Sequence, residues 1–255
     1  MITLGCDVGS LFTKAVLLCD GELAASAIIE TTGTIAAELP GFIEDLLARG
    51  QVARGQVEAI AATGRGGSLA GEADFVEEEM ACVGVAVRHL MREVDRVVEI
   101  GGQSISAMLL DPDGDLLDFV RNDKCASGSG RFLEVMSDAL GIPIGELDEH
   151  AARASRDTPL SSQCGVFVES EVITHLNAGE DPADIAAGLC DAVARIIVSQ
   201  AKRLSEQAPY TLTGGVARIQ GVVRRVQRRL SGEYRAFPKD PALAAALGAA
   251  LLAAE

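Results

Sequence analysis

Hydrophobic residues occur along the chain in short runs that end at glycine turns, and one such arrangement occurs twice. Each copy predicts a strand, a glycine turn, a strand, an Asp-Gly turn and a strand, which together make a three-stranded meander. The second copy follows the first by 92 residues from Asp7 to Glu99 and by 93 from Asp20 to Asp113. The repeated segments are Asp7-Val8-Gly9-Ser10, Ala15-Val16-Leu17-Leu18 and Asp20-Gly21-Glu22-Leu23, then Glu99-Ile100-Gly101-Gly102, Ala107-Met108-Leu109-Leu110 and Asp113-Gly114-Asp115-Leu116. The pattern therefore indicates an internal duplication.

After each meander the apolar spacing changes to that of helices, with a further strand in each half. The first half is expected to contain a helix over about 34–49, a strand at 57–62 and a helix around 75–93. The second half is expected to contain helices near 129–140, 166–177, 183–206 and 216–231, with strands at 210–213 and 234–237. Pro241 is well placed to open a final alanine-rich helix, because proline is favoured in the first turn.

These elements predict an α/β fold made of two βββαβα halves around a cleft. Residues 1–95 form the expected N-terminal subdomain, and residues 96–240 form a C-terminal subdomain that carries two cysteine segments. Residues 241–255 form a helix that is expected to pack back on the N-terminal subdomain. Two halves with an acidic residue and a glycine turn after the first strand resemble the actin, sugar-kinase and Hsp70 superfamily of ribonuclease H-like ATPase folds. There the two turns are phosphate-binding loops that face each other.

The glycine turns have the chemistry of nucleotide-binding loops. Glycine allows backbone N–H groups to approach phosphate oxygens, and hydroxyl and ammonium groups add contacts. Asp7 and Glu99, one from each half, are placed to hold Mg²⁺ through its waters, and Gln103 is a candidate to help position the reacting water. The Gly-Lys-Ser/Thr of a Walker-type loop does not occur. The candidate nucleotide-binding residues are Gly9, Ser10, Thr13, Lys14, Gly101, Gly102, Gly214, Gly215 and Val216.

Composition limits the class of protein. A formal net charge of −15 argues against a nucleic-acid partner. Charges interrupt every long apolar run, so no membrane span is expected, and nothing at the start resembles a secretory signal. The protein is expected to be cytoplasmic, where the six cysteines have little tendency to form disulfides. Cys6, Cys19 and Cys190 lie in apolar patterns and are interpreted as core residues, whereas the pattern around Cys82 is less clear.

Two cysteines differ from these because each precedes a helical pattern in a polar loop. Cys125 lies in Asn122-Asp123-Lys124-Cys125-Ala126-Ser127-Gly128-Ser129-Gly130, and Cys164 lies in Ser161-Ser162-Gln163-Cys164-Gly165. A helix N-terminus favours a thiolate, which suits a nucleophile or a metal-cluster ligand; the alternative is a cysteine that fills a loop corner. Two thiolates cannot complete a four-cysteine site, so a [4Fe–4S] cluster would need two more from a second chain. A Cys125–Cys164 disulfide is the competing structural idea.

With these motifs, the chain resembles the ATPase family of benzoyl-CoA reductase and 2-hydroxyacyl-CoA dehydratase activators. The resemblance implies one [4Fe–4S] cluster that bridges a dimer through Cys125 and Cys164, with ATP or ADP and Mg²⁺ bound in the cleft. The dimer partner would be a second copy or a paralogous ATPase subunit. A ferredoxin or flavodoxin would donate electrons, and a CoA-ester reductase or dehydratase would accept them. The matching segments are Gly5 to Ser10, Ala62-Thr63-Gly64, Gly101-Gly102-Gln103, Asn122 to Glu134, Val166 to Ile173, Thr213 to Ala217 and Gly248 to Leu251.

The sequence departs from the family pattern at three loops. Ser104 stands where the activators usually have Asp, Arg65-Gly66-Gly67 stands where they carry Tyr-Gly-Arg, and Val83 stands where they have His. The Cys-Ala-Ser-Gly-Ser-Gly form resembles the smaller of the two unlike ATPase subunits of benzoyl-CoA reductases. These departures predict slow ATP hydrolysis by this chain alone.

Two other classes of function fit the same fold. A small-molecule kinase would be colourless and would have no use for the two cysteine segments. A nucleotide-binding regulatory subunit would bind ATP without turnover, which Ser104 would allow. A brown colour after anaerobic purification distinguishes the activator from the kinase, and phosphate release distinguishes it from the regulatory subunit.

Overall fold

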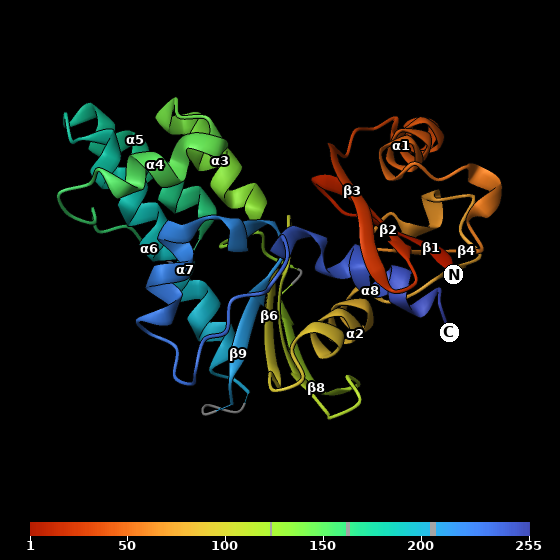
Figure 1. The fold of residues 1–255 in the computed structure, drawn as a ribbon. Helices are drawn as coiled ribbons and strands as arrows, with labels where there is room; N and C mark the ends of the chain where they lie inside the picture. Colours follow the sequence, from red (N-terminus) through yellow and green to blue (C-terminus); the bar gives the residue numbers. More distant parts are fainter. Residues whose placement is uncertain (123, 162–163, 205–207) are drawn as a thin grey trace.

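The computed structural model describes residues 1–122, 124–161, 164–204 and 208–255. Within them the chain forms two β-sheets flanked by helices (Figure 1). The first sheet has the strand order β3-β2-β1-β4-β5, with β2 antiparallel and β4 parallel to the central strand β1. Its strands are β1 (Ile2–Val8), β2 (Phe12–Cys19), β3 (Glu22–Glu30), β4 (Ala59–Thr63) and β5 (Phe75–Val76).

The second sheet repeats the plan of the first. Its order is β8-β7-β6-β9, and β6 lies antiparallel to β7 and parallel to β9, as β1 does to β2 and β4. Its strands are β6 (Arg96–Ile100), β7 (Ile105–Leu110), β8 (Leu116–Asn122) and β9 (Tyr210–Thr213). Asp7 and Glu99 occupy equivalent places, because Asp7 pairs with Thr63 on β4 and Glu99 with Thr213 on β9. The predicted duplication and fold class are confirmed.

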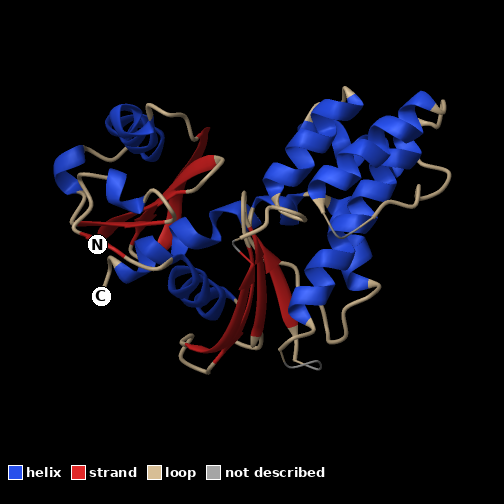
Figure 2. Cartoon of the chain, turned by 180° about the vertical axis from the view of Figure 1, so that it is seen from behind, coloured by secondary structure: helices blue, strands red, loops and turns tan. Residues whose placement is uncertain are grey.

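Helices flank both sheets and fill the space between them (Figure 2). Helix α1 buries Ile35, Leu39, Phe42 and Leu46, at helical spacing, against the first sheet. Helices α2 and α8 share a core with residues of both sheets, and α3 to α7 share the core of the second. The helices are α1 (Ile35–Gly50), α2 (Glu79–Leu90), α3 (Gly130–Leu140), α4 (Leu147–Ala152), α5 (Gly165–Asn177), α6 (Pro182–Ala201), α7 (Gln220–Gln227) and α8 (Ala244–Leu252).

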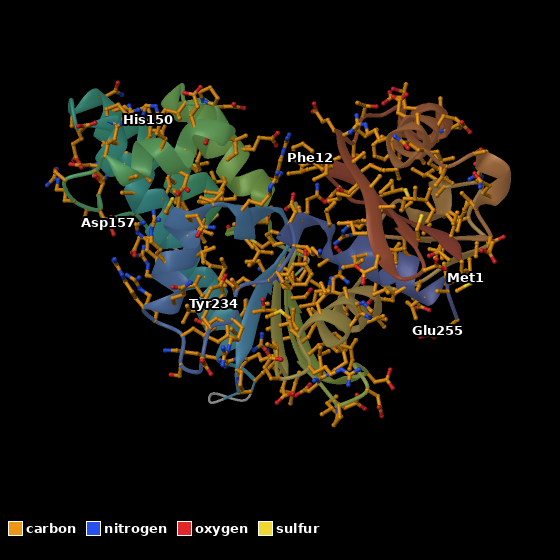
Figure 3. All side chains as sticks on the ribbon, in the orientation of Figure 1. Met1, Phe12, His150, Asp157, Tyr234 and Glu255 are labelled. Carbon is orange, nitrogen blue, oxygen red and sulfur yellow. The ribbon has the colours of Figure 1, made fainter. Side chains whose placement is uncertain are left out.

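The last helix returns to the first strand of the chain. The buried hydroxyl of Thr3 on β1 donates a 2.8 Å hydrogen bond to the carbonyl of Ala250 on α8. Met1 and Glu255 consequently lie at the same end of the molecule (Figure 3). No helix in the described ranges is long and apolar enough to cross a bilayer.

Several predicted boundaries were wrong at element ends. The helix expected around 75–93 begins at Glu79, because Phe75–Val76 adds to the sheet edge as β5 and Glu78 then caps the helix by accepting from the N–H of Met80. The helix expected over 216–231 is α7, which follows a 3₁₀ turn at Gly215–Arg218. Helix α4 was not predicted at all. Its six residues are too few for a periodic signal.

Two further predictions concern the end of α6 and the segment after α7. The helix expected over 183–206 is α6, which ends at Ala201; residues 205–207 lie outside the described residues. The strand expected at 234–237 is only a single bridge between Tyr210 and Tyr234. The pairing ends after Arg235, whose N–H donates a 2.8 Å hydrogen bond to the carbonyl of Tyr210.

Candidate functional site

The first half contributes a buried ion pair at the end of β1. Asp7 and Lys14 are direct neighbours across β1 and β2, and the Lys14 ammonium donates a 2.7 Å hydrogen bond to Oδ2 of Asp7. Burial by itself lowers the pKa of Lys14, but the Asp7 carboxylate more than offsets this and the net shift is upward. Lys14 is therefore held as a cation at the cavity wall, with one carboxylate already beside it.

The second half contributes Glu99, at the place equivalent to Asp7. Burial, and then the nearby Glu79 carboxylate, raise the pKa of Glu99 to about 8. Among the described residues, Oδ1 of Asp7 and Oε2 of Glu99 are buried without a hydrogen-bond partner. Two orphaned acceptor oxygens from opposite halves fit a hydrated Mg²⁺ ion with its bound phosphates, because Mg²⁺ keeps several waters and uses few protein ligands.

The backbone turns behind the two acids require glycine. Gly64 follows Thr63 with φ of 85°, and a Cβ there would lie 2.3 Å from Oδ1 of Asp7. Gly214 follows Thr213 with φ of 87°, and a Cβ there would lie 2.4 Å from Oε1 of Glu99. In each half, a glycine with positive φ leaves the space that the carboxylate at the end of the first strand occupies.

Glu79 is a site residue that the sequence pattern did not reveal. It lies in the first turn of α2, lines the cavity and accepts a 2.8 Å hydrogen bond from Arg121 on β8. Burial and then the Asp7 carboxylate raise the pKa of Glu79, against the opposing charge of Arg121. The acidic run Glu77-Glu78-Glu79 ahead of an apolar helix was the available signal.

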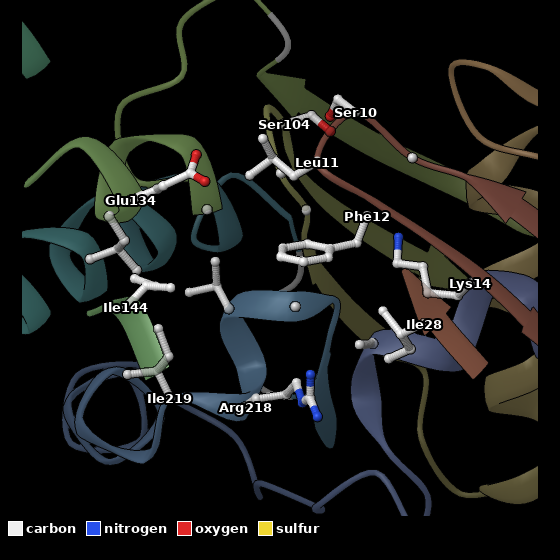
Figure 4. Close-up of a pocket in the computed structure, with 18 of the residues that line it drawn as sticks. Ser10, Leu11, Phe12, Lys14, Ile28, Ser104, Glu134, Ile144, Arg218 and Ile219 are labelled. Carbon is white, nitrogen blue, oxygen red and sulfur yellow. The ribbon is translucent and has the colours of Figure 1, made fainter. Parts of the chain in front are cut away.

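Between the two halves lies a cavity of about 510 Å³. Its wall carries polar and charged side chains from both halves, namely Ser10, Lys14, Arg65, Glu79, Glu99, Ser104, Glu134, Asp148 and Arg218, beside the glycines of the turns. Apolar side chains lie among them, namely Leu11, Phe12, Ile28, Leu133, Ile144, Val216 and Ile219. Figure 4 shows the Phe12 ring between Lys14 and Ile144, and the same side chain lies between the two halves in Figure 3. A cavity that combines apolar walls with several polar and charged groups suits a nucleotide.

The structure brings most of the predicted site residues to this cavity, but Asp7, Thr13, Gln103 and Gly214 do not line it. Asp7 is 2% exposed and lies behind the wall, beside Lys14. Thr13 is fully buried, and its hydroxyl shares a 3.0 Å hydrogen bond with Thr31. Gln103 is exposed and does not line the cavity. Gly214 lies behind the wall, against Glu99 and Ile100, while Gly215 and Val216 line it. A glycine motif does not reveal which of its residues face the cavity and which are buried or exposed elsewhere. The sequence therefore did not distinguish the lining residues from the others.

The Cys125 loop is joined to the second glycine turn through the start of α3. The N–H groups of Gly130 and Arg131 donate to the carbonyls of Gly101 and Gly102 at 2.9 and 2.8 Å. These are first-turn N–H groups, which have no acceptor within their own helix. The wall of the cavity and the segment that carries Cys125 are thus one hydrogen-bonded unit.

The two cysteines differ in how they meet their helices. Cys164 is the N-cap residue of α5, as the sequence indicated. Cys125 lies four residues before Ser129, the N-cap of α3, and therefore not at the helix start itself. Hydrogen bonds from the hydroxyl and backbone of Ser127 lower the pKa of Cys125. Asp123, Ser162 and Gln163, from the two motifs, lie outside the described residues.

All six cysteines carry free thiols, so the Cys125–Cys164 disulfide is not formed. Cys6, Cys82 and Cys190 are fully buried, and burial raises the pKa of each to about 12. Cys19 and Cys164 are half-buried and Cys125 is exposed, so the interpretation of Cys19 as a core residue was wrong. In the part of the chain described, no group of three or more His, Cys, Asp or Glu side chains could hold a metal ion. Cys125, which is exposed, and Cys164, which is half-buried, would provide half of a four-thiolate site.

Two equivalent strand–glycine units, with a carboxylate at the end of each and a cavity between them, define an actin-like ATPase fold. The model of the BadF/BadG/BcrA/BcrD ATPase family matches residues 4–253, and the chain belongs to this family. It is similar to the (R)-2-hydroxyglutaryl-CoA dehydratase activating ATPase of Acidaminococcus fermentans, with 35% identity over 98% of this chain and 96% of that protein.

A solved structure and a more distant relative extend the comparison. The activator of the 2-hydroxyisocaproyl-CoA dehydratase from Clostridium difficile, solved with bound ADPNP, has a TM-score of 0.93. It is 38% identical, over 99% of this chain and 94% of that one. A subunit of the benzoyl-CoA reductase of Thauera aromatica is 27% identical over 98% of this chain and 92% of that protein.

Proposed function

We propose that this protein is an ATP-dependent electron activator for a CoA-ester dehydratase. It binds ATP with Mg²⁺ in the cavity between its halves, and two copies together hold one [4Fe–4S] cluster through Cys125 and Cys164 of each. When bound, the cluster supplies one-electron chemistry at low potential. A ferredoxin or flavodoxin donates the electron. The protein's own residues bind the nucleotide, position the metal and transmit the change to the cysteine segments.

The observation that carries this proposal is the hydrogen-bonded unit between the cavity and the Cys125 loop. Gly101 and Gly102 line the cavity and accept hydrogen bonds from the first turn of α3, five residues after Cys125. A movement of the loop on nucleotide binding is therefore passed directly to the cysteine segment. A kinase has no need for such a connection, so the arrangement favours the activator over the small-molecule kinase.

The surface around Cys164 supports a dimer. Val166, Phe167 and Ile173 on α5 have 70, 66 and 46% of their surface exposed, and they lie two, three and nine residues after Cys164. An exposed apolar helix face beside an incomplete ligand set suits a second copy of the same chain. The identities of 35 and 38% to dehydratase activators, against 27% to the benzoyl-CoA reductase component, favour a dehydratase as the acceptor.

Iron content tests the ligand assignment. Anaerobically purified protein should be brown and contain about two irons per chain, because a [4Fe–4S] cluster is shared by two chains. Cys125→Ser or Cys164→Ser should each abolish the cluster, since each removes two of four thiolates in a symmetric site. Cys19→Ser is the matched control and should retain the iron. Normal iron in either ligand variant would contradict the assignment.

Phosphate release tests the nucleotide half independently. Asp7→Asn and Lys14→Ala should each lower Mg²⁺–ATP hydrolysis, through loss of metal contacts and of phosphate charge respectively. If both variants hydrolyse ATP at the wild-type rate, the nucleotide is bound elsewhere.

A further inference from the structure

Ser127 makes contacts to both cysteine segments. The residue is only 8% exposed. Its hydroxyl oxygen accepts hydrogen bonds from the N–H of Gly165 at 3.0 Å and from the protonated thiol of Cys125 at 3.2 Å. Gly165 immediately follows Cys164, so one hydroxyl connects the surroundings of the two thiols.

The contact with Gly165 replaces a missing helix cap. Gly165 is the first residue of α5, and its N–H has no acceptor within the helix. The N-cap residue Cys164 makes no side-chain capping bond. Ser127, 38 residues earlier in the chain, supplies the acceptor. A Cβ on residue 165 would lie 3.3 Å from the ring of Phe132, which is a tight contact, and 3.6 Å from the Ser127 hydroxyl, which is an ordinary one.

The contacts of the Ser127 hydroxyl determine where its single proton can point. A serine hydroxyl has one donor and two acceptor positions. Because the Gly165 N–H uses an acceptor position, the proton is free to point at the Cys125 sulfur when that sulfur is a thiolate or a metal ligand. Ser129, in the same turn, cannot take this part because its hydroxyl donates to the carbonyl of Ala126 at 2.6 Å.

We propose that Ser127 is a positioning residue that holds the Cys125 and Cys164 segments together and donates a hydrogen bond to the Cys125 sulfur, raising the reduction potential of the cluster bound there. This inference rests on the proposed function for its redox part only. Hydrogen bonds to cluster sulfurs stabilise the reduced, more negative state, so their number affects the potential. Ser127 thus affects both the geometry of the two segments and the potential of the cluster.

The test compares Ser127→Ala with Ser127→Thr, which keeps a hydroxyl, and with Ser129→Ala, which removes a neighbouring hydroxyl from the same turn. In metal-free protein, hydrogen–deuterium exchange at the first turn of α5 should be at least several-fold faster in Ser127→Ala than in wild type. The other two variants should exchange at the wild-type rate. Unchanged exchange in Ser127→Ala would overturn the proposed link between the segments.

The redox part is measured on cluster-loaded protein. Ser127→Ala should have a more negative midpoint potential than wild type, with Ser127→Thr close to wild type and Ser129→Ala unchanged. An unshifted potential in Ser127→Ala, at normal iron content, would refute the hydrogen bond to the sulfur. If wild-type protein holds no iron, the proposed function and the redox part fail together, while the exchange experiment still decides whether Ser127 joins the segments.

Discussion

Three carboxylates lie near a single lysine, and their mutual repulsion and burial set the pKa values of the residues around the cavity. Glu79 and Glu99 line the cavity from α2 and β6, and Asp7 on β1 lies behind Lys14 and accepts its hydrogen bond. The pKa values of Glu79 and Glu99 are raised by burial and by a neighbouring carboxylate. A divalent cation with a polyphosphate would supply the positive charge and the acceptors that such a site needs.

Glu99 gives the metal-free protein a pH-dependent stability. Its pKa is about 8 in the folded state, against an ordinary value of 4.5, so the folded state binds more protons between these values. Its contribution is fully present below pH 4.5 and is lost as the pH rises through about 8. The melting temperature should therefore fall between about pH 6.5 and 8.5, by about 2–4 °C for each kcal/mol lost.

Glu99→Gln is the matched comparison for this titration. Glutamine keeps the shape without the ionisable group, so the fall in melting temperature over this interval should be smaller in the variant. Thermal unfolding followed by circular dichroism provides the measurement. Parallel pH curves for the two proteins would assign the dependence to other groups.

We expect slow ATP hydrolysis because Ser104 provides no carboxylate at its place in the cavity wall. Ser104 is 7% exposed and lines the cavity, and its hydroxyl lies near that of Ser10 (Figure 4). Wild-type protein alone should bind ATP and hydrolyse it slowly, and Ser104→Asp should restore part of the rate, about tenfold or more, because a carboxylate there can orient water or the hydration shell of the metal. Phosphate release under saturating Mg²⁺–ATP measures this, with the exposed Ser68→Asp as control. A fast wild-type ATPase would contradict the expectation.

The end of strand β8 connects the cavity wall to the cysteine loop. Arg121 on β8 donates to Glu78 and Glu79 at the start of α2, at 2.9 and 2.8 Å. The next residue, Asn122, donates from its side-chain amide to the carbonyl of Cys125 at 3.3 Å. Strand β8 therefore contacts the cavity wall and the cysteine loop at adjacent residues, in addition to the connection through α3.

The ends of helices and strands were predicted least well where a hydrogen bond from a residue distant in the sequence fixes the end. Helix α7 begins at Gln220 because Asp148, on α4, accepts from the N–H groups of Gln220 and Gly221 at 3.2 and 2.6 Å. That acceptor comes from 73 residues away in the chain for Gly221. A local pattern contains no information about such a cap. Strand β9 was predicted to the residue because Tyr210-Thr211-Leu212-Thr213 ends directly at a glycine pair.

At the scale of the whole molecule, the exposed face of α5 determines assembly in the proposed dimer. Phe167→Asp should dissociate the dimer and release the iron, because each buried phenylalanine contributes about 1.5–3 kcal/mol and the symmetric interface loses two. The dissociation constant should rise on the order of a hundredfold or more. Analytical ultracentrifugation of anaerobic protein measures this.

Phe119→Asp is the control for this prediction. Phe119 lies on the edge strand β8 and is 50% exposed, close to the exposure of Phe167. This variant should remain dimeric and keep its iron. Dissociation of the Phe119 variant with an intact Phe167 variant would place the interface on β8 instead of α5.

The sequence by itself determined the duplicated meander, the acid at the end of each first strand, and the resemblance to an activator ATPase. These depend on local order along the chain: a strand that ends at a glycine leaves its last polar side chain at the sheet edge, and a repeated order produces a repeated sheet. The fold, family and most cavity residues followed from that.

Only the tertiary structure decided which residues from different segments meet. Glu79 reaches the cavity and pairs with a residue 42 positions away, and Ser127 joins segments separated by 38. Thr13 and Gln103, which belong to the glycine motifs, point elsewhere. The physical reason is that burial and hydrogen-bond partners depend on how helices and sheets pack, and packing contacts between distant segments leave no periodic signal in either segment.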